Sequence, residues 1–185
     1  SWVERFSDQM LSEMDAALCT YQATGKAAWQ ATPEAFPIPS CGPLLNRAFE
    51  ALDSGTGFAV LSGLPVDDYS YDENLILYCG LLSHLGRIVV QNYEGQSIVD
   101  VVDKGVEYSH RARGYSSNKL LPFHTDGADF AGLLCLGKAA DGGASLIASA
   151  PQIFNEIAAE RPDVLETLMR GYYHHRRGQH EPDED

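Results

Sequence analysis

The sequence predicts an α+β fold, mainly β in its central part, with helices flanking a barrel-like or sandwich-like β core. Two patterns predict this class. In several segments apolar residues recur at three- and four-residue steps, which is the spacing of one helix face. Short apolar runs elsewhere are bounded by glycine or polar residues, as β-strands are. The strands do not alternate regularly with helices, and this argues against a doubly wound parallel sheet.

Three helices and one strand are expected in the first half of the chain. The first helix covers residues 2–21, where large apolar side chains share one face. The second covers residues 43–53, because Pro43 suits the first turn of a helix. The third covers residues 72–85 and is closed by a glycine. Residues 57–63 form a short apolar run between glycines, which predicts a buried strand.

The second half is expected to hold further strands and two short helices. The expected strands are residues 88–91, 97–102, 130–136, 145–148 and 172–176. Ser149 is placed to cap a helix that opens at Pro151, and Arg161-Pro162 separates it from a helix ending near Arg170. Residues 110–121 have no clear period and predict a loop. The total is about six strands against about eight in a closed jelly roll, so we expect part of the fold to be absent.

Composition restricts the classes of partner. The 185 residues carry 13 Lys and Arg against 26 Asp and Glu, a formal net charge of −13. Neutralising phosphates or anionic lipid needs the opposite balance, so neither nucleic acid nor a membrane is an expected partner. No apolar run is long enough to span a bilayer and no signal pattern opens the sequence, which favours a cytoplasmic protein. The oligomeric state, including a homo-oligomer, stays open.

The residues that carry chemistry lie in the run Phe123-His124-Thr125-Asp126-Gly127. On extended chain, side chains two positions apart project to the same side, so His124 and Asp126 can reach one metal ion. With a second histidine they would complete a two-histidine, one-carboxylate triad, which leaves positions on ferrous iron for a co-substrate and oxygen. The alternative is that His124 is an ordinary hydrogen-bonded histidine, because three-residue patterns are common by chance.

Residues 57–178 resemble the TauD/TfdA family of taurine dioxygenase-like, iron(II)- and 2-oxoglutarate-dependent oxygenases. The resemblance rests on the run 57–65, on His124-Thr125-Asp126, on Gly142-Gly143-Ala144-Ser145, and on the helical insert after residue 150. It implies a double-stranded β-helix core, also called a jelly roll or cupin-like core. It also implies Fe(II) as cofactor, and 2-oxoglutarate and O2 as co-substrates.

The resemblance assigns roles to particular residues. His124 and Asp126 would be two of the three iron ligands, and the Ser145 hydroxyl would bind a carboxylate of 2-oxoglutarate. Arg113, Tyr115 and Asn118 lie in a segment that resembles the variable lid of these enzymes, where they are candidates for substrate binding. An ordinary solvated loop is the alternative for those three residues.

The third iron ligand is not evident in this sequence. In the family the distal histidine, and an arginine that pairs with 2-oxoglutarate, lie much farther from the metal motif than this chain extends. We therefore expect both beyond Asp185, in a single oxygenase domain that continues past this residue. Its parts here would be a helical segment 1–55, a jelly-roll segment 56–178 and an acidic tail 179–185. The local alternative is that one of His174, His175 and His180 completes the triad.

Three functions from different classes are compatible with these residues. The first is a dioxygenase that hydroxylates or otherwise oxidises a small polar molecule, such as an amino acid or a natural-product intermediate, and releases succinate and CO2. The second is a zinc-type hydrolase in which a local histidine joins His124 and Asp126 to activate water. The third is a non-catalytic binding protein with an incomplete metal site. A serine hydrolase is not expected, because no G-x-S-x-G motif is present.

Overall fold

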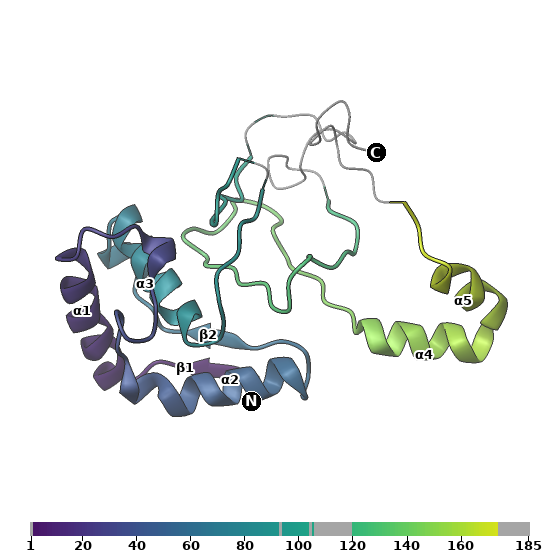
Figure 1. Cartoon of the computed structure of the whole chain (residues 1–185), viewed down its shortest axis with the longest axis horizontal. Coiled ribbons are helices and arrows are strands. Elements are labelled where there is room, and N and C mark those ends of the chain that lie inside the picture. Colours follow the sequence, from purple (N-terminus) through teal and green to yellow (C-terminus); the bar gives the residue numbers. More distant parts are fainter. Residues whose placement is uncertain (1, 93, 104, 106–119, 174–185) are drawn as a thin grey trace. The chain divides into compact units, whose positions relative to one another are not determined.

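The computed structural model describes residues 2–92, 94–103, 105 and 120–173. These divide into two compact units: residues 1–98 with 126–142, and residues 99–125 with 143–185. The first unit holds most of the regular structure, and the second holds two helices, as Figure 1 shows. The expected single domain, with divisions at residues 55 and 178, stays a prediction.

The first unit contains a two-stranded parallel sheet. Strand β1 (Val3–Arg5) pairs with β2 (Val60–Ser62), with Val3 opposite Val60. Strand β2 confirms the strand expected in residues 57–63. The expectation of a helix from residue 2 onward is wrong. Residues 3–5 form β1, and the helix begins only at Asp8, where the Ser7 side chain accepts a hydrogen bond from the Met10 amide.

Three helices and three short 3-10 turns complete the first unit. The helices are α1 (Asp8–Gln22), α2 (Gly42–Asp53) and α3 (Tyr71–Ser83), and the turns are η1 (Ala28–Gln30), η2 (Pro39–Cys41) and η3 (Val66–Asp68). The helix bounds agree with the expected ones to within two residues, apart from the start of α1. At the start of α3, Ser70 and Glu73 form a reciprocal capping box that satisfies two backbone amides.

The hydrophobic core of this unit lies among α1, η2, α2 and α3. Its largest fully buried side chains are Tyr21, Phe36, Met14, Ile38, Leu44, Leu77, Cys41 and Cys79. Phe36 packs edge-on against Tyr21, with ring centroids 6.4 Å apart, and the Phe36 carbonyl accepts a hydrogen bond from His84 Nε2 at 2.9 Å. The connection between η1 and α2 is thereby fixed against α1 and the end of α3.

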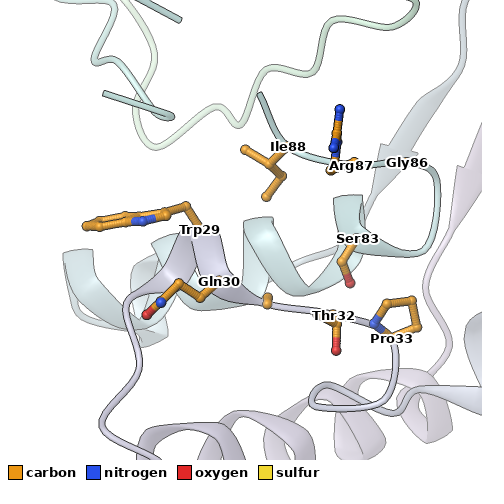
Figure 2. A pocket seen from close by; sticks show the side chains of 9 residues that line it. Trp29, Gln30, Thr32, Pro33, Ser83, Gly86, Arg87 and Ile88 are labelled. Carbon is orange, nitrogen blue, oxygen red and sulfur yellow. The ribbon is translucent and has the colours of Figure 1, made fainter. Parts of the chain in front are cut away.

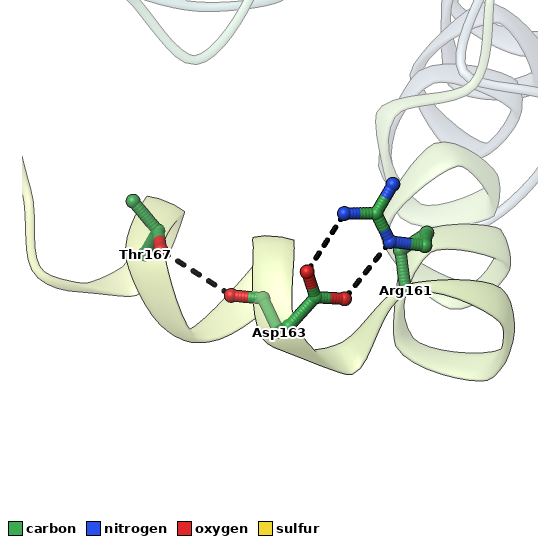
Figure 3. Close-up of polar contacts among 3 residues, drawn as sticks. All are labelled: Arg161, Asp163 and Thr167. Atoms are coloured by element: carbon green, nitrogen blue, oxygen red, sulfur yellow. Dashed lines mark hydrogen bonds and ion pairs between the residues drawn. The ribbon is translucent and has the colours of Figure 1, made fainter.

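The second unit contains α4 (Ala150–Glu160) and α5 (Pro162–Met169). As expected, the Ser149 side chain caps α4, accepting from the Gln152 amide at 3.2 Å, and Arg161-Pro162 separates the two helices. At the junction Arg161 makes two hydrogen bonds to the Asp163 carboxylate, at 2.9 and 2.7 Å (Figure 3). Both side chains are mostly exposed, so this pair orients the turn more than it stabilises the fold.

Most of the expected strands are not observed. Residues 88–91, 97–102, 130–136 and 145–148 are neither helix nor strand, and the described part of the segment 172–176 is not a strand either. Most of the loop expected at 110–121 lies outside the described residues. The physical reason is that a strand is stabilised by pairing with a neighbour, and among the described residues only β1 and β2 are paired. No helix in the described part of the chain is long and apolar enough to cross a membrane.

Candidate metal site

The two predicted metal ligands lie in an exposed segment without helix or strand. His124 and Asp126 are both exposed to solvent. The division between the compact units falls between Thr125 and Asp126, so His124 belongs to the second unit and Asp126 to the first.

The hydrogen bonding of His124 determines which ring nitrogen suits a metal. Its Nδ1 lies 2.9 Å from the carbonyl oxygen of Pro122. A carbonyl can only accept, so Nδ1 must carry the proton, and in the neutral imidazole the lone pair is then on Nε2. Histidine ligands of metals are commonly oriented in this way, by donation from the other ring nitrogen to a backbone carbonyl. This hydrogen bond is compatible with metal binding through Nε2.

The donor set fits part of an iron site. One imidazole and one carboxylate are two of the three protein ligands of the facial triad that binds non-haem Fe(II). Within the described ranges, no group of three or more His, Cys, Asp or Glu side chains lies close enough together to hold a metal ion. The pair therefore supplies the ligand types of this site and needs a third ligand from elsewhere.

The predicted co-substrate residue follows a glycine turn. Gly142 and Gly143 have φ angles of +73° and +76°, in the left-handed region that glycine adopts without strain. Ser145, two residues further, is exposed and lies in neither helix nor strand in the second unit. The substrate-binding candidates Arg113, Tyr115 and Asn118 lie outside the described residues, as do His174, His175 and His180.

Sequence patterns missed the contacts that hold the chain just after Asp126. Phe130 packs edge-on against Phe49 of α2, with ring centroids 5.6 Å apart and an interplanar angle of 71°. Gly132 lies against α3, beside Tyr78 and Leu82. Burial raises the pKa of Tyr78 to about 12, so this phenol stays protonated near neutral pH and is not a general base. No local signal identifies this long-range contact.

A separate depression lies between η1 and the end of α3. It has a volume of about 360 Å³ and is lined by Trp29, Gln30, Ala31, Thr32, Pro33, Ser83, Gly86, Arg87 and Ile88. Arg87 is its only charged lining residue, and Figure 2 shows this side chain extending away from Thr32 and Ser83. None of the residues predicted for the metal or co-substrate site lines the depression.

A histidine and an aspartate two residues apart, with the histidine held as the Nδ1-H tautomer, define a candidate metalloprotein of the non-haem iron class. The chain belongs to the TauD/TfdA family. The family model described as taurine catabolism dioxygenase TauD, TfdA family, matches residues 20–185, which include the metal motif and Ser145. The fold of this family is the double-stranded β-helix, whereas the described residues form mostly helices and one pair of short parallel strands.

Two relatives are similar over most of this chain. The FR-33289 synthase of Streptomyces rubellomurinus is 33% identical over 185 residues, covering 99% of this chain and 55% of the relative. A taurine hydroxylase-like protein of Stachybotrys chartarum is 35% identical over 170 residues, covering 88% of this chain and 44% of the relative. The chain thus spans about half the length of these relatives.

Proposed function

We propose that the protein is an Fe(II)- and 2-oxoglutarate-dependent dioxygenase that hydroxylates or otherwise oxidises a small polar molecule, an amino acid or a natural-product intermediate. The products of the co-substrate would be succinate and CO2. The observation that carries the proposal is the family match across residues 20–185, which include a His-x-Asp pair whose histidine contacts a backbone carbonyl through Nδ1. The names of the relatives, a synthase and a taurine hydroxylase-like protein, are consistent with small-molecule chemistry.

Each residue of the pair has a defined task. Iron, when bound, activates O2 and drives the oxidative decarboxylation of 2-oxoglutarate. His124 would bind it through Nε2, and Asp126 would bind it through a carboxylate that also offsets its positive charge. Asp126 would take the coordination position that a halide would need, so hydroxylation, desaturation or cyclisation is expected rather than chlorination.

Binding of 2-oxoglutarate would use a second group of this chain. The Ser145 hydroxyl, which is exposed and follows the Gly142-Gly143 pair, would donate to a carboxylate of 2-oxoglutarate. The lid residues Arg113, Tyr115 and Asn118 would contact the substrate and exclude water from the iron. We propose that the second histidine ligand and the arginine that pairs with 2-oxoglutarate lie beyond Asp185.

The test is an anaerobic titration of the full-length protein with Fe(II) and 2-oxoglutarate. We expect the visible charge-transfer band of a chelated 2-oxo acid, and its loss in His124→Ala and in Asp126→Ala. Asp141→Ala is a matched control, because Asp141 is an exposed acid of the same segment with no role in the proposed site. Absence of the band in the unmodified protein, or its survival in either ligand variant, would overturn the proposal.

A further inference from the structure

The segment that begins at Asp126 is held at two points on the helices of the first unit. Residues 126–142 belong to the same compact unit as α2 and α3. The first point is the edge-on contact of Phe130 with Phe49, at 5.6 Å between ring centroids. Phe130 is half-buried, whereas the neighbouring residues 120–129 are all exposed. Phe130 is therefore the first residue after the metal motif whose side chain is partly buried.

The second point is the close approach of the backbone at Gly132 to α3. A Cβ atom added at Gly132 would lie 3.0 Å from the Tyr78 hydroxyl oxygen, and 3.1 and 3.2 Å from the two methyl carbons of Leu82. These distances are shorter than ordinary contacts between heavy atoms, which are about 3.5–4.0 Å. A Cβ here would require the ends of these two side chains, or the segment itself, to shift by a few tenths of an ångström. Tyr78 and Leu82 thus form a surface that accepts bare backbone.

Only a short length of chain separates the proposed ligand Asp126 from Phe130. Asp126 precedes Phe130 by four residues, and extended chain spans at most about 3.6 Å per residue, so Asp126 stays within roughly 14 Å of Phe130. Fixing Phe130 and Gly132 therefore restricts the volume that the carboxylate can explore. A ligand held near its bound position loses less conformational freedom when the metal binds.

We propose that Phe49, Tyr78 and Leu82 are positioning residues that hold the segment after Asp126 and thereby place this carboxylate for metal binding. The inference rests on the proposed function in one respect, namely that Asp126 is a metal ligand. It adds a task for the helical part of the chain, in which no metal ligand is proposed. The residues act through Phe130 and Gly132 and do not touch the metal.

Two measurements on the full-length protein test the inference. The first is hydrogen exchange of the backbone amides of residues 127–134 in metal-free protein, and the second is the affinity for Mn(II) as a redox-stable substitute for Fe(II). In Phe49→Ala we expect severalfold faster exchange in this segment and about tenfold weaker Mn(II) binding, the usual cost of losing a residue that orients a ligand. Gly132→Val should act in the same direction.

Control variants separate positioning from a general loss of structure. Phe154→Ala removes a phenylalanine of similar exposure on α4, in the other unit, and should leave both quantities unchanged. Phe49→Tyr keeps the aromatic edge and should restore both. Circular dichroism should show the same helix content in Phe49→Ala as in the unmodified protein, because Phe49 is 40% exposed.

The outcomes distinguish this inference from the proposed function. If the unmodified protein binds no Mn(II), Asp126 is not a metal ligand, and both the proposed function and the inference are wrong. If the unmodified protein binds Mn(II) and Phe49→Ala binds it equally well, the proposed function stands and the inference is wrong, whatever the exchange rates show. Weaker binding with faster local exchange, restored in Phe49→Tyr, supports both.

Discussion

Replacing Gly80 by alanine sets two effects on the same helix against each other. Gly80 lies inside α3, where alanine is favoured over glycine by about 1 kcal/mol of helix propensity. The added Cβ, however, would lie 2.5 Å from Cγ and Cδ1 of Phe36 and 2.7 Å from Cε1. Because the Phe36 ring is completely buried, it has no solvent space into which to move.

The packing cost exceeds the gain in propensity. Ordinary contact distances are about 3.5–4.0 Å, so ring or helix must move by roughly 1 Å or more. Phe36 is held on its other side by the edge contact with Tyr21, and its carbonyl is bound by His84. Overpacking of this kind costs about 1–3 kcal/mol, and these constraints place it at the upper end. The net loss is about 2 kcal/mol, or roughly 4–8 °C in the midpoint of thermal unfolding.

The assay is thermal and urea unfolding followed by far-ultraviolet circular dichroism. Gly42→Ala is the matched control, because Gly42 opens α2 with helical backbone angles and has open space where a Cβ would lie. It should be as stable as the unmodified protein. Equal or higher stability of Gly80→Ala would refute the packing argument, since helix propensity would then have prevailed.

Three further outcomes are expected. Ser145→Ala should raise the 2-oxoglutarate concentration for half-maximal rate about tenfold, with a smaller loss of maximal rate, and a loss confined to the maximal rate would contradict the assignment. Hydrogen bonds from the Ser70 backbone and side chain lower the pKa of Glu73 below 4.5, so its ionised form stabilises the fold above pH 4.5 and that contribution disappears as pH falls through the lowered value. Glu73→Gln should therefore be less stable than the unmodified protein in urea unfolding well above pH 4.5, and the difference should vanish in acid; a constant difference would argue against this origin. Ser149→Ala should destabilise α4 by about 1 kcal/mol, visible as lost helical dichroism, whereas Ser149→Asp should retain the cap.

The helices could be predicted from the sequence because their determinants are local. The proline at position 43, the serine cap at position 149 and the Arg161-Pro162 break each act within one turn, and α2, α4 and α5 begin where these signals lie. The start of α1 is the exception. Residues 3–5 lie in a stretch of helical spacing, yet they pair with residues 60–62, and no local pattern reports a partner so distant along the chain.

The expected strands show the opposite case. Residues 130–136 and 145–148 have strand-like composition, but Leu133 is 82% exposed and Ile147 is 65% exposed. A helix satisfies its backbone within its own segment, whereas a strand needs a neighbour, which these segments lack among the described residues. Composition therefore indicates which segments suit a β-sheet without determining whether they are paired.

The candidate site depends both on local sequence signals and on contacts between residues distant along the chain. The proposal of His124 and Asp126 as ligands follows from three consecutive residues, and His124 bonds to the carbonyl of Pro122 only two residues before it. The segment after Asp126 is held by the contact of Phe130 with Phe49. In the sequence Phe49 is only one of several apolar residues of a helix, and nothing there indicates this contact. Because the chemistry of a ligand is local and its placement is not, a substitution at Phe49 should weaken metal binding without changing any donor atom.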